Sequence, residues 1–149
     1  MTGDAEAFLE WVLPRMRSAD LALHNGDPTA RIAMWSRNDP VTVFGNAVSA
    51  KGWNDIGPLF EALATRFSGC TSYEVEVVAA DAGADLGYVV AIERTTASIA
   101  GREPAAFALR VTTVFRREGA EWKVAHRHAD AYDEGAREGA AHLRESGLR

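Results

Sequence analysis

The sequence contains one cysteine, Cys70, among its 149 residues. A single thiol cannot form a disulfide within the chain, which suits a reducing compartment. No apolar run approaches the ~20 residues that a membrane-spanning helix needs. The first residues, MTGDAEAFLEW, are acidic and lack the basic region and apolar core of a secretory signal. We therefore expect a soluble cytoplasmic protein with no membrane partner.

Positive charge is also scarce, with 16 Lys and Arg against 21 Asp and Glu and a formal net charge of -5. A nucleic-acid-binding domain would need a basic stripe, so we expect no nucleic acid partner. The composition, with 47% hydrophobic and 25% charged residues, is typical of a globular protein. Its length favours one domain, which we place at 1–132, followed by a charged tail or marginal helix at 133–149.

Three helices are predicted in the N-terminal half. The first spans about 4–25, because apolar residues recur along it at three- and four-residue spacing. Pro14 should kink or split this helix, since proline removes a backbone donor and clashes with the preceding turn. A short second helix ends near Trp35, and a third spans about 54–67.

From residue 72 onwards the pattern changes to that of β-strands separated by short polar turns. A short β-rich run at 41–44 precedes the third helix. The fold class is therefore α+β, with three N-terminal helices packed in the concave face of a curved antiparallel β-sheet, forming a cone. The long strands are expected at 72–80, 86–99, 104–117 and 121–131.

The densest group of ionisable residues lies in the last predicted hairpin, RVTTVFRREGAEWKVAHRHAD at 110–130. Side chains on a strand alternate between two faces. The final strand therefore places two histidines and a carboxylate on one face, behind an aromatic residue. We interpret this face as the wall of a pocket. Its members are Trp122, Val124, His126, His128 and Asp130.

The order of the motifs resembles a known family. Two helices, WSxxDPVTVFG, GW, a third helix and four strands ending in RVTxVxRR…WKVxHRHAD are similar to the SnoaL-like group of the NTF2-like superfamily. The resemblance covers residues 5–131. It implies a homodimer that pairs through the outer sheet face and a pocket inside the cone. This fold hosts isomerases, dehydratases, cyclases, hydrolases and non-catalytic binding domains, so the resemblance does not specify the function.

The sequence departs from ketosteroid isomerase, a member of that superfamily. The isomerase uses an Asp base, a Tyr donor and a protonated Asp. Its base follows the first strand, where this chain has Phe44, Gly45 and Asn46. Its tyrosine lies in the first helix, and residues 4–25 contain none. We therefore do not expect ketosteroid isomerase activity.

Two turns are compatible with the last hairpin. A three-residue loop at 118–120 pairs Arg110 with His128. A two-residue loop, Gly119-Ala120, would move every residue of the earlier strand to the other face. We favour the first, because the resemblance places these polar residues in one cavity. It also leaves an apolar surface for dimerisation on the opposite face, made of Phe107, Leu109, Val111 and Phe115.

Four residues form the expected catalytic group. His126 or His128 would act as acid or base, because imidazole titrates near neutral pH. Asp130 would orient one imidazole, and Arg110 would stabilise negative charge through its planar guanidinium. Two other interpretations stay open: a buried polar network, and a metal site for which one short motif is weak support. We assign no metal ligand and no cofactor.

Seven further residues are expected to line the pocket. Most are aromatic or polar residues from the strands and from the ends of helices. Arg94 is expected to point inward, in phase with Tyr88, Val90 and Ile92. The full lining set is Trp35, Phe44, Asn46, Trp53, Arg94, Thr112 and Trp122.

These observations predict a homodimer that binds a small, partly apolar organic molecule in a conical pocket. If the protein is an enzyme, the expected chemistry is proton transfer at a carbonyl compound: isomerisation, dehydration or cyclisation. The alternative is a non-catalytic interaction or sensory domain whose cone is filled by Trp and Phe side chains. An open pocket exposing His126 or His128 would favour the first prediction, and a filled cone the second.

Overall fold

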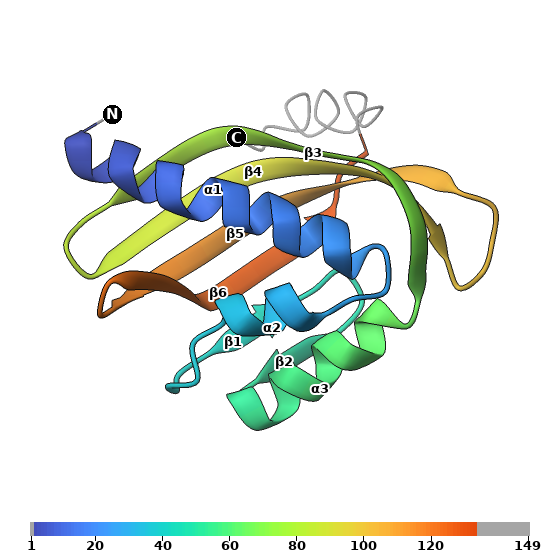
Figure 1. The fold of residues 1–149 in the computed structure, drawn as a ribbon, viewed down its shortest axis with the longest axis horizontal. Coiled ribbons are helices and arrows are strands. Elements are labelled where there is room, and N and C mark those ends of the chain that lie inside the picture. The colour runs from blue at the N-terminus through green and yellow to red at the C-terminus, as the bar shows by residue number, and fades with distance from the viewer. Residues whose placement is uncertain (1, 134–149) are drawn as a thin grey trace, which may run out of the picture.

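The computed structural model describes residues 2–133, so the tail predicted at 133–149 lies, apart from Asp133, outside the described residues. The helices lie against one face of a curved sheet (Figure 1). No helix in the described range is long and apolar enough to cross a membrane. The elements are α1 (Gly3–Leu23), α2 (Thr29–Met34), β1 (Thr42–Phe44), β2 (Ser49–Lys51), α3 (Trp53–Ala64), β3 (Phe67–Ala82), β4 (Leu86–Ile99), β5 (Ala105–Glu118) and β6 (Glu121–Ala131).

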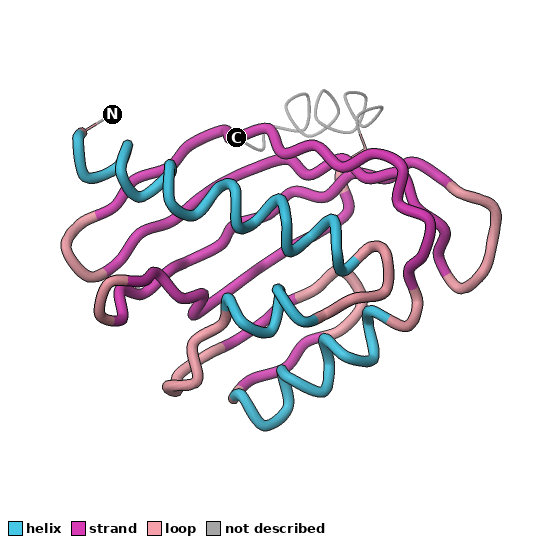
Figure 2. Tube along the Cα trace, viewed as in Figure 1, coloured by secondary structure: helices cyan, strands magenta, loops and turns pink. Residues whose placement is uncertain are grey.

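The strands form one sheet in the order β2-β1-β6-β5-β4-β3. Neighbouring strands are antiparallel except β1 and β6, which run parallel. The sheet curves around the helices without closing (Figure 2), so the predicted α+β cone is confirmed. The sheet is therefore mixed and not wholly antiparallel. The parallel pairing of β1 with β6 is possible because a long connection, which includes β2, α3 and β3 to β5, separates the two strands in the chain.

Helix α1 is continuous through Pro14, where the sequence predicted a kink or break. At its start the Thr2 Oγ1 accepts a hydrogen bond of 3.2 Å from the Ala5 N–H. Pro14 is exposed, and buried residues lie on both sides of it along the helix. Packing against the sheet therefore holds both halves in line. The buried residues are Ala5, Phe8, Val12, Met16, Ala19, Asp20 and Leu23.

Aromatic and aliphatic side chains fill most of the space between the helices and the sheet. Phe8 packs edge-on against Phe115 and Trp122, with ring centroids 5.4 and 4.9 Å away. Trp35 packs against Phe60 at 5.1 Å. Full burial of a large apolar side chain contributes about 1.5–3 kcal/mol. These residues therefore hold the helices on the concave face.

Gly87 on β4 lies against the ring of Phe8. A Cβ at this position would come within 2.8 Å of that ring. We therefore expect Gly87→Ala to lower the free energy of unfolding by about 1–3 kcal/mol, because the ring must move in a filled core. Urea unfolding followed by tryptophan fluorescence measures the change. Gly83→Ala is the control, since a Cβ there meets nothing within 4 Å. Equal losses in the two variants would contradict this packing.

The β5–β6 hairpin has the shorter of the two predicted turns. Glu118 pairs with Glu121 across Gly119-Ala120. Gly119 has a φ of 63°, a backbone conformation that glycine adopts at little cost. The favoured three-residue loop is therefore wrong, and so is the pairing of Arg110 with His128.

A β-bulge at Ala125 changes the phase of β6. Phe115 pairs with Val124, but the preceding Val114 pairs with His126, so Ala125 is the extra residue. Trp122 and Val124 are buried in the core. The residues after the bulge have the opposite phase, and the five predicted pocket-wall residues therefore do not share a face. His126, His128 and Asp130 lie on the outer face of the sheet, away from the helices.

The apolar residues predicted to form the dimer surface lie inside the fold. Val111 and Phe115 are fully buried, and the ring of Phe107 packs against those of His24 and Phe67. Leu109 pairs across the sheet with the buried Glu93 and shares its face. The strand residues of the other phase form the outer face. They include Phe44, Tyr88, Val90, Ile92, Thr112 and Val114.

Candidate functional site

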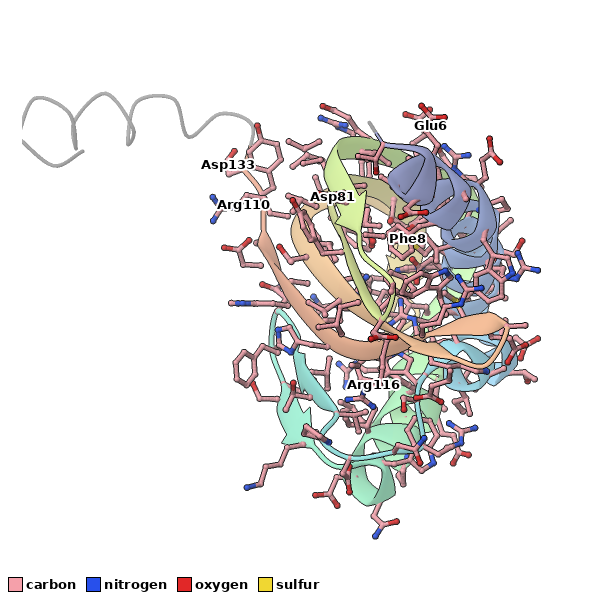
Figure 3. The ribbon with its side chains drawn as sticks, turned by 90° about the vertical axis from the view of Figure 1, so that its left-hand side faces the viewer. Glu6, Phe8, Asp81, Arg110, Arg116 and Asp133 are labelled. Atoms are coloured by element: carbon pink, nitrogen blue, oxygen red, sulfur yellow. The ribbon has the colours of Figure 1, made fainter. Side chains whose placement is uncertain are left out.

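The four residues of the predicted catalytic group come together on the outer face. The His126 and His128 rings are 6.4 Å apart, and the ring of Phe44 lies edge-on to both at 5.6 and 5.5 Å. Arg110 donates to Asp130 from two nitrogens, and in Figure 3 it points away from the helices. This group therefore does not line the cone, and its catalytic role stays a prediction.

The predicted pocket-lining residues are divided between the two faces. Trp35 is buried in the cone. Trp53 packs against the core and carries the Arg37 guanidinium 3.7 Å above its ring. Trp122 is buried beside Phe8. Four others lie on the outer face or in a loop: Phe44 and Thr112 beside His128, Arg94 paired with Glu76 at 2.9 Å, and Asn46, which accepts from the Ala131 N–H.

A buried polar cluster occupies the centre of the cone instead. Asp20 on α1 forms an ion pair with Arg31 on α2 and accepts a 2.6 Å hydrogen bond from the Tyr73 hydroxyl on β3. Arg127 on β6 donates to both carboxylate oxygens of Glu93 on β4, at 2.9 and 3.1 Å. The cluster thus joins five elements that are distant in sequence through two buried ion pairs.

The pKa values of Asp20, Tyr73 and His24 are shifted from the ordinary values of these side chains. Burial alone would raise the pKa of Asp20, but Arg31, Arg127 and the Tyr73 hydroxyl lower it to about 2. Burial, followed by the charge of Asp20, raises the pKa of Tyr73. Burial lowers the pKa of His24, which follows α1 and whose Nδ1 lies 2.6 Å from the backbone oxygen of Asp20. Near pH 7 Asp20 is therefore ionised, the Tyr73 phenol is protonated and the His24 imidazole is neutral.

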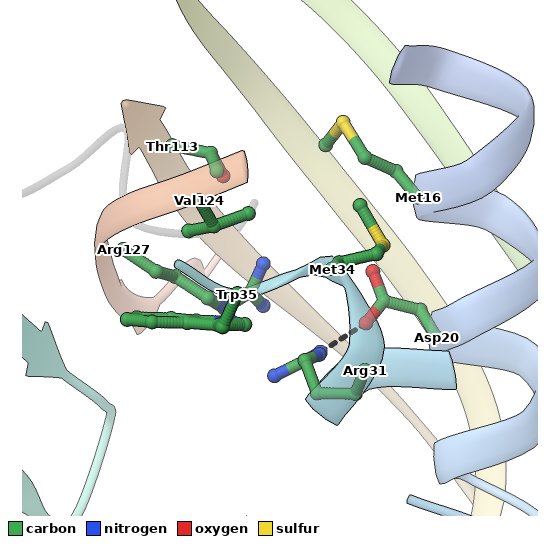
Figure 4. Close-up of a pocket in the computed structure, with 8 residues that line it drawn as sticks. All are labelled: Met16, Asp20, Arg31, Met34, Trp35, Thr113, Val124 and Arg127. Carbon is green, nitrogen blue, oxygen red and sulfur yellow. Dashed lines mark hydrogen bonds and ion pairs between the residues drawn. The ribbon is translucent and has the colours of Figure 1, made fainter. Parts of the chain in front are cut away.

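A small cavity lies within this cluster (Figure 4). Its free volume is about 20 Å³, room for one water molecule. Among the residues that the structure describes, Thr113 Oγ1 is the one buried side-chain N or O atom without a hydrogen-bond partner, and Thr113 lines the cavity. The full lining is Met16, Asp20, Arg31, Met34, Trp35, Thr113, Val124 and Arg127.

Most of this cluster was not predicted from the sequence, although the sequence contains one signal for it. Asp20 follows Met16 by four positions and precedes Leu23 by three, so it lies within the apolar stripe of α1. A carboxylate there must be buried and needs a partner. No comparable signal exists for Arg31, which lies in a helix of six residues.

The cluster does not have the composition of a metal site. Its carboxylates are paired with arginines. In the described part of the chain, no group of three or more His, Cys, Asp or Glu side chains is placed to hold a metal ion. The cluster instead contains one hydroxyl without a hydrogen-bond partner, that of Thr113, beside a cavity with room for one water molecule. Each buried carboxylate around it is paired with an arginine.

The fold is similar to several solved structures. A candidate ketosteroid isomerase from Parabacteroides distasonis has 13% identity and a TM-score of 0.64, covering 83% of this chain and 86% of that one. A candidate scytalone dehydratase from Novosphingobium aromaticivorans has 15% identity and a TM-score of 0.68, covering 84% of each chain. The CaMKII hub of S. rosetta has 23% identity and a TM-score of 0.64, covering 89% and 99%. At these identities the likeness shows the fold.

A match to a protein-family model assigns the chain to a family. The model described as a SnoaL-like domain matches residues 16–132, which include the C-terminal part of α1, α2, α3 and all six strands. A comparison with curated proteins gives no match. The cone, the mixed sheet and this match together show that the chain belongs to the family of SnoaL-like domains.

Proposed function

We propose that the chain binds a compact, uncharged and partly apolar organic molecule in the cone. The observation that carries this proposal is the Thr113 hydroxyl, which is buried, lines the cavity and has no partner among the described residues. A buried hydroxyl without a partner costs about 1–3 kcal/mol. A ligand that hydrogen-bonds to Thr113 would offset that cost.

The charge balance of the cluster favours an uncharged ligand. Asp20 and Glu93 each have an arginine partner, so an added ion would enter a low-dielectric space without a counter-charge. The rest of the lining is apolar, from Met16, Met34, Trp35 and Val124. Methionine side chains adapt their shape readily, so Met16 and Met34 are the residues whose movement would enlarge the cavity for an organic molecule.

The pKa values favour binding rather than proton transfer in the cone. A general acid or base works best with a pKa near the working pH. Asp20, with a pKa of about 2, stays ionised at pH 7, and Tyr73, with a raised pKa, stays protonated. His126 and His128 lie across the sheet from the cavity. We therefore place isomerase or dehydratase chemistry second to binding.

Acetone and acetate, which have nearly the same shape but differ in charge, test this proposal. We expect acetone to shift the amide NMR signals around Thr113 saturably, and acetate to have no such effect. Thr113→Val keeps the shape of the side chain and removes the hydroxyl, so it should weaken acetone binding at least about fivefold. Thr112→Val on the outer face is the matched control. Unchanged acetone binding by Thr113→Val, or tighter binding of acetate, would contradict the proposal.

A second candidate function is self-association through the outer sheet face. Tyr88 and Phe44 are 42% and 47% exposed there, and Val90, Ile92 and Val114 share the same face. Apolar side chains spread over several strands are typical of an interaction surface. The likeness to the CaMKII hub of S. rosetta supports an assembly role. A homodimer with a largely filled cone would then be a non-catalytic domain.

The cytoplasmic location stays a prediction.

A further inference from the structure

We propose that a groove beside the first turns of α1 is a second binding site, which takes a small aromatic carboxylate. The groove lies at the end of the fold where α1 begins and where the β3–β4 and β5–β6 turns meet. Figure 3 looks onto this end, with Phe8 directed from α1 towards the sheet. The lining residues that carry the argument are Asp4, Phe8, Trp11, Arg117 and Trp122.

The size of the groove suits an organic ligand. Its free volume is about 370 Å³, within the usual range for small-molecule sites. The groove and the central cavity share no lining residue, and the packed rings of Phe8, Phe115 and Trp122 form the core beside the groove. The two sites are therefore separate, and this inference does not rest on the proposed function.

Arg117 provides the positive charge of the groove. Its guanidinium lies over the Trp122 ring, 5.1 Å from the centroid, and its Nε donates to the Gly119 carbonyl at 3.3 Å. Its two terminal nitrogens have no acceptor within residues 2–133. Stacking and one backbone bond thus orient the guanidinium while leaving its planar pair of donors for a carboxylate.

Trp122 provides a second donor. The side chain is only 5% exposed, and its indole N–H has no acceptor among the described residues. Thr113 Oγ1 is the one buried unpartnered side-chain atom in that part of the chain, so the indole nitrogen of Trp122 is not completely buried. The groove is the opening that Trp122 lines. Arg117 and Trp122 therefore line the same groove.

The remaining walls favour an aromatic ring and a single negative charge. Trp11 and three alanines provide apolar surface against which a flat ring can pack, with the buried Phe8 behind them. Asp4 is the other charged residue in the lining. Its carboxylate would repel an anion, and a dianion more than a monoanion. A benzoate-like molecule matches this combination better than a phosphate does.

Titration with sodium benzoate, observed through the tryptophan indole N–H signals in NMR spectra, tests the inference. We expect a saturable shift of the Trp122 signal. Arg117→Gln should weaken benzoate binding at least about tenfold, which corresponds to one lost charge-assisted hydrogen bond. Asp4→Asn should bind benzoate more tightly, because a like charge is removed. Arg102→Gln, an exposed site in the β4–β5 turn, should bind like the wild type.

Three results would overturn the inference: no saturable shift, equal binding of benzoate by Arg117→Gln and the wild type, or equal binding of benzoate and uncharged benzamide. The comparison with benzamide and the Asp4→Asn variant keep the test decisive if Arg117→Gln folds poorly. Thr113→Val should bind benzoate normally, which separates this site from the central cavity.

Discussion

Replacing Arg127 with methionine is expected to lower the free energy of unfolding by about 3–5 kcal/mol, because Glu93 would remain in the cone as an unpaired charge. Arg127 donates two hydrogen bonds to Glu93, whose side chain is almost fully buried. The charge of Arg127 also lowers the pKa of Asp20. Urea denaturation followed by tryptophan fluorescence measures the loss.

The outer face provides the matched control for this prediction. Arg110 is paired with Asp130, but both side chains are exposed, so Arg110→Met should cost far less. Replacing Glu93 and Arg127 together with methionine should recover at least about half of the loss, because no buried charge is left unpaired. Equal losses for Arg127→Met and Arg110→Met would show that Arg127 does not lie inside the cone.

Tyr88→Glu is expected to abolish self-association through the outer sheet face. Tyr88 lies in one row across the sheet with Val114 and His126. A symmetric interface contains each substitution twice and would bury both charges. We therefore expect the dimer dissociation constant, measured by sedimentation velocity, to rise at least about 100-fold.

Leu21→Glu provides the control for this second prediction. Leu21 lies on α1, on the opposite side of the fold, and is 45% exposed against 42% for Tyr88. It should leave the dissociation constant unchanged. A wild-type protein that is monomeric at all accessible concentrations would exclude the self-association function. A dimer unaffected by Tyr88→Glu would place the interface elsewhere.

Periodicity in the sequence predicted three of the four long strands to within one residue at each end, whereas the strand predicted at 72–80 spans Phe67–Ala82 as β3. The strands predicted at 86–99 and 121–131 are observed as β4 and β6 with the same bounds. The first helix was also predicted within two residues at each end. These elements follow local patterns of apolar residues, which the sequence records directly.

The direction of the side chains in β6 was not predictable in the same way. A single bulge at Ala125 reverses the phase, so His126 and His128 face outward while Arg127 faces the cone. Alternation alone assigns all residues of a strand to two faces and cannot reveal an inserted residue. The candidate site moved from one face of the sheet to the other for this reason.

Arg94 shows the same limit on β4. The neighbouring Glu93 is the buried member of the pair, and Arg94 lies on the outer face with Glu76. Two adjacent charged residues give no local indication of which one is inside. Only Arg127, which lies 34 positions further along the chain, identifies Glu93 as the inward residue.

Nuclear Overhauser contacts between bound acetone and the protein, measured by NMR, test most directly whether the cone binds a small organic molecule. We expect contacts from the acetone methyl groups to the methyl groups of Met16, Met34 and Thr113, which line the central cavity. Loss of these contacts in Thr113→Val would identify the hydroxyl as the ligand's anchor. Contacts confined to Phe44, His126 and His128 on the outer face, or no contacts at any ligand concentration, would contradict binding in the cone.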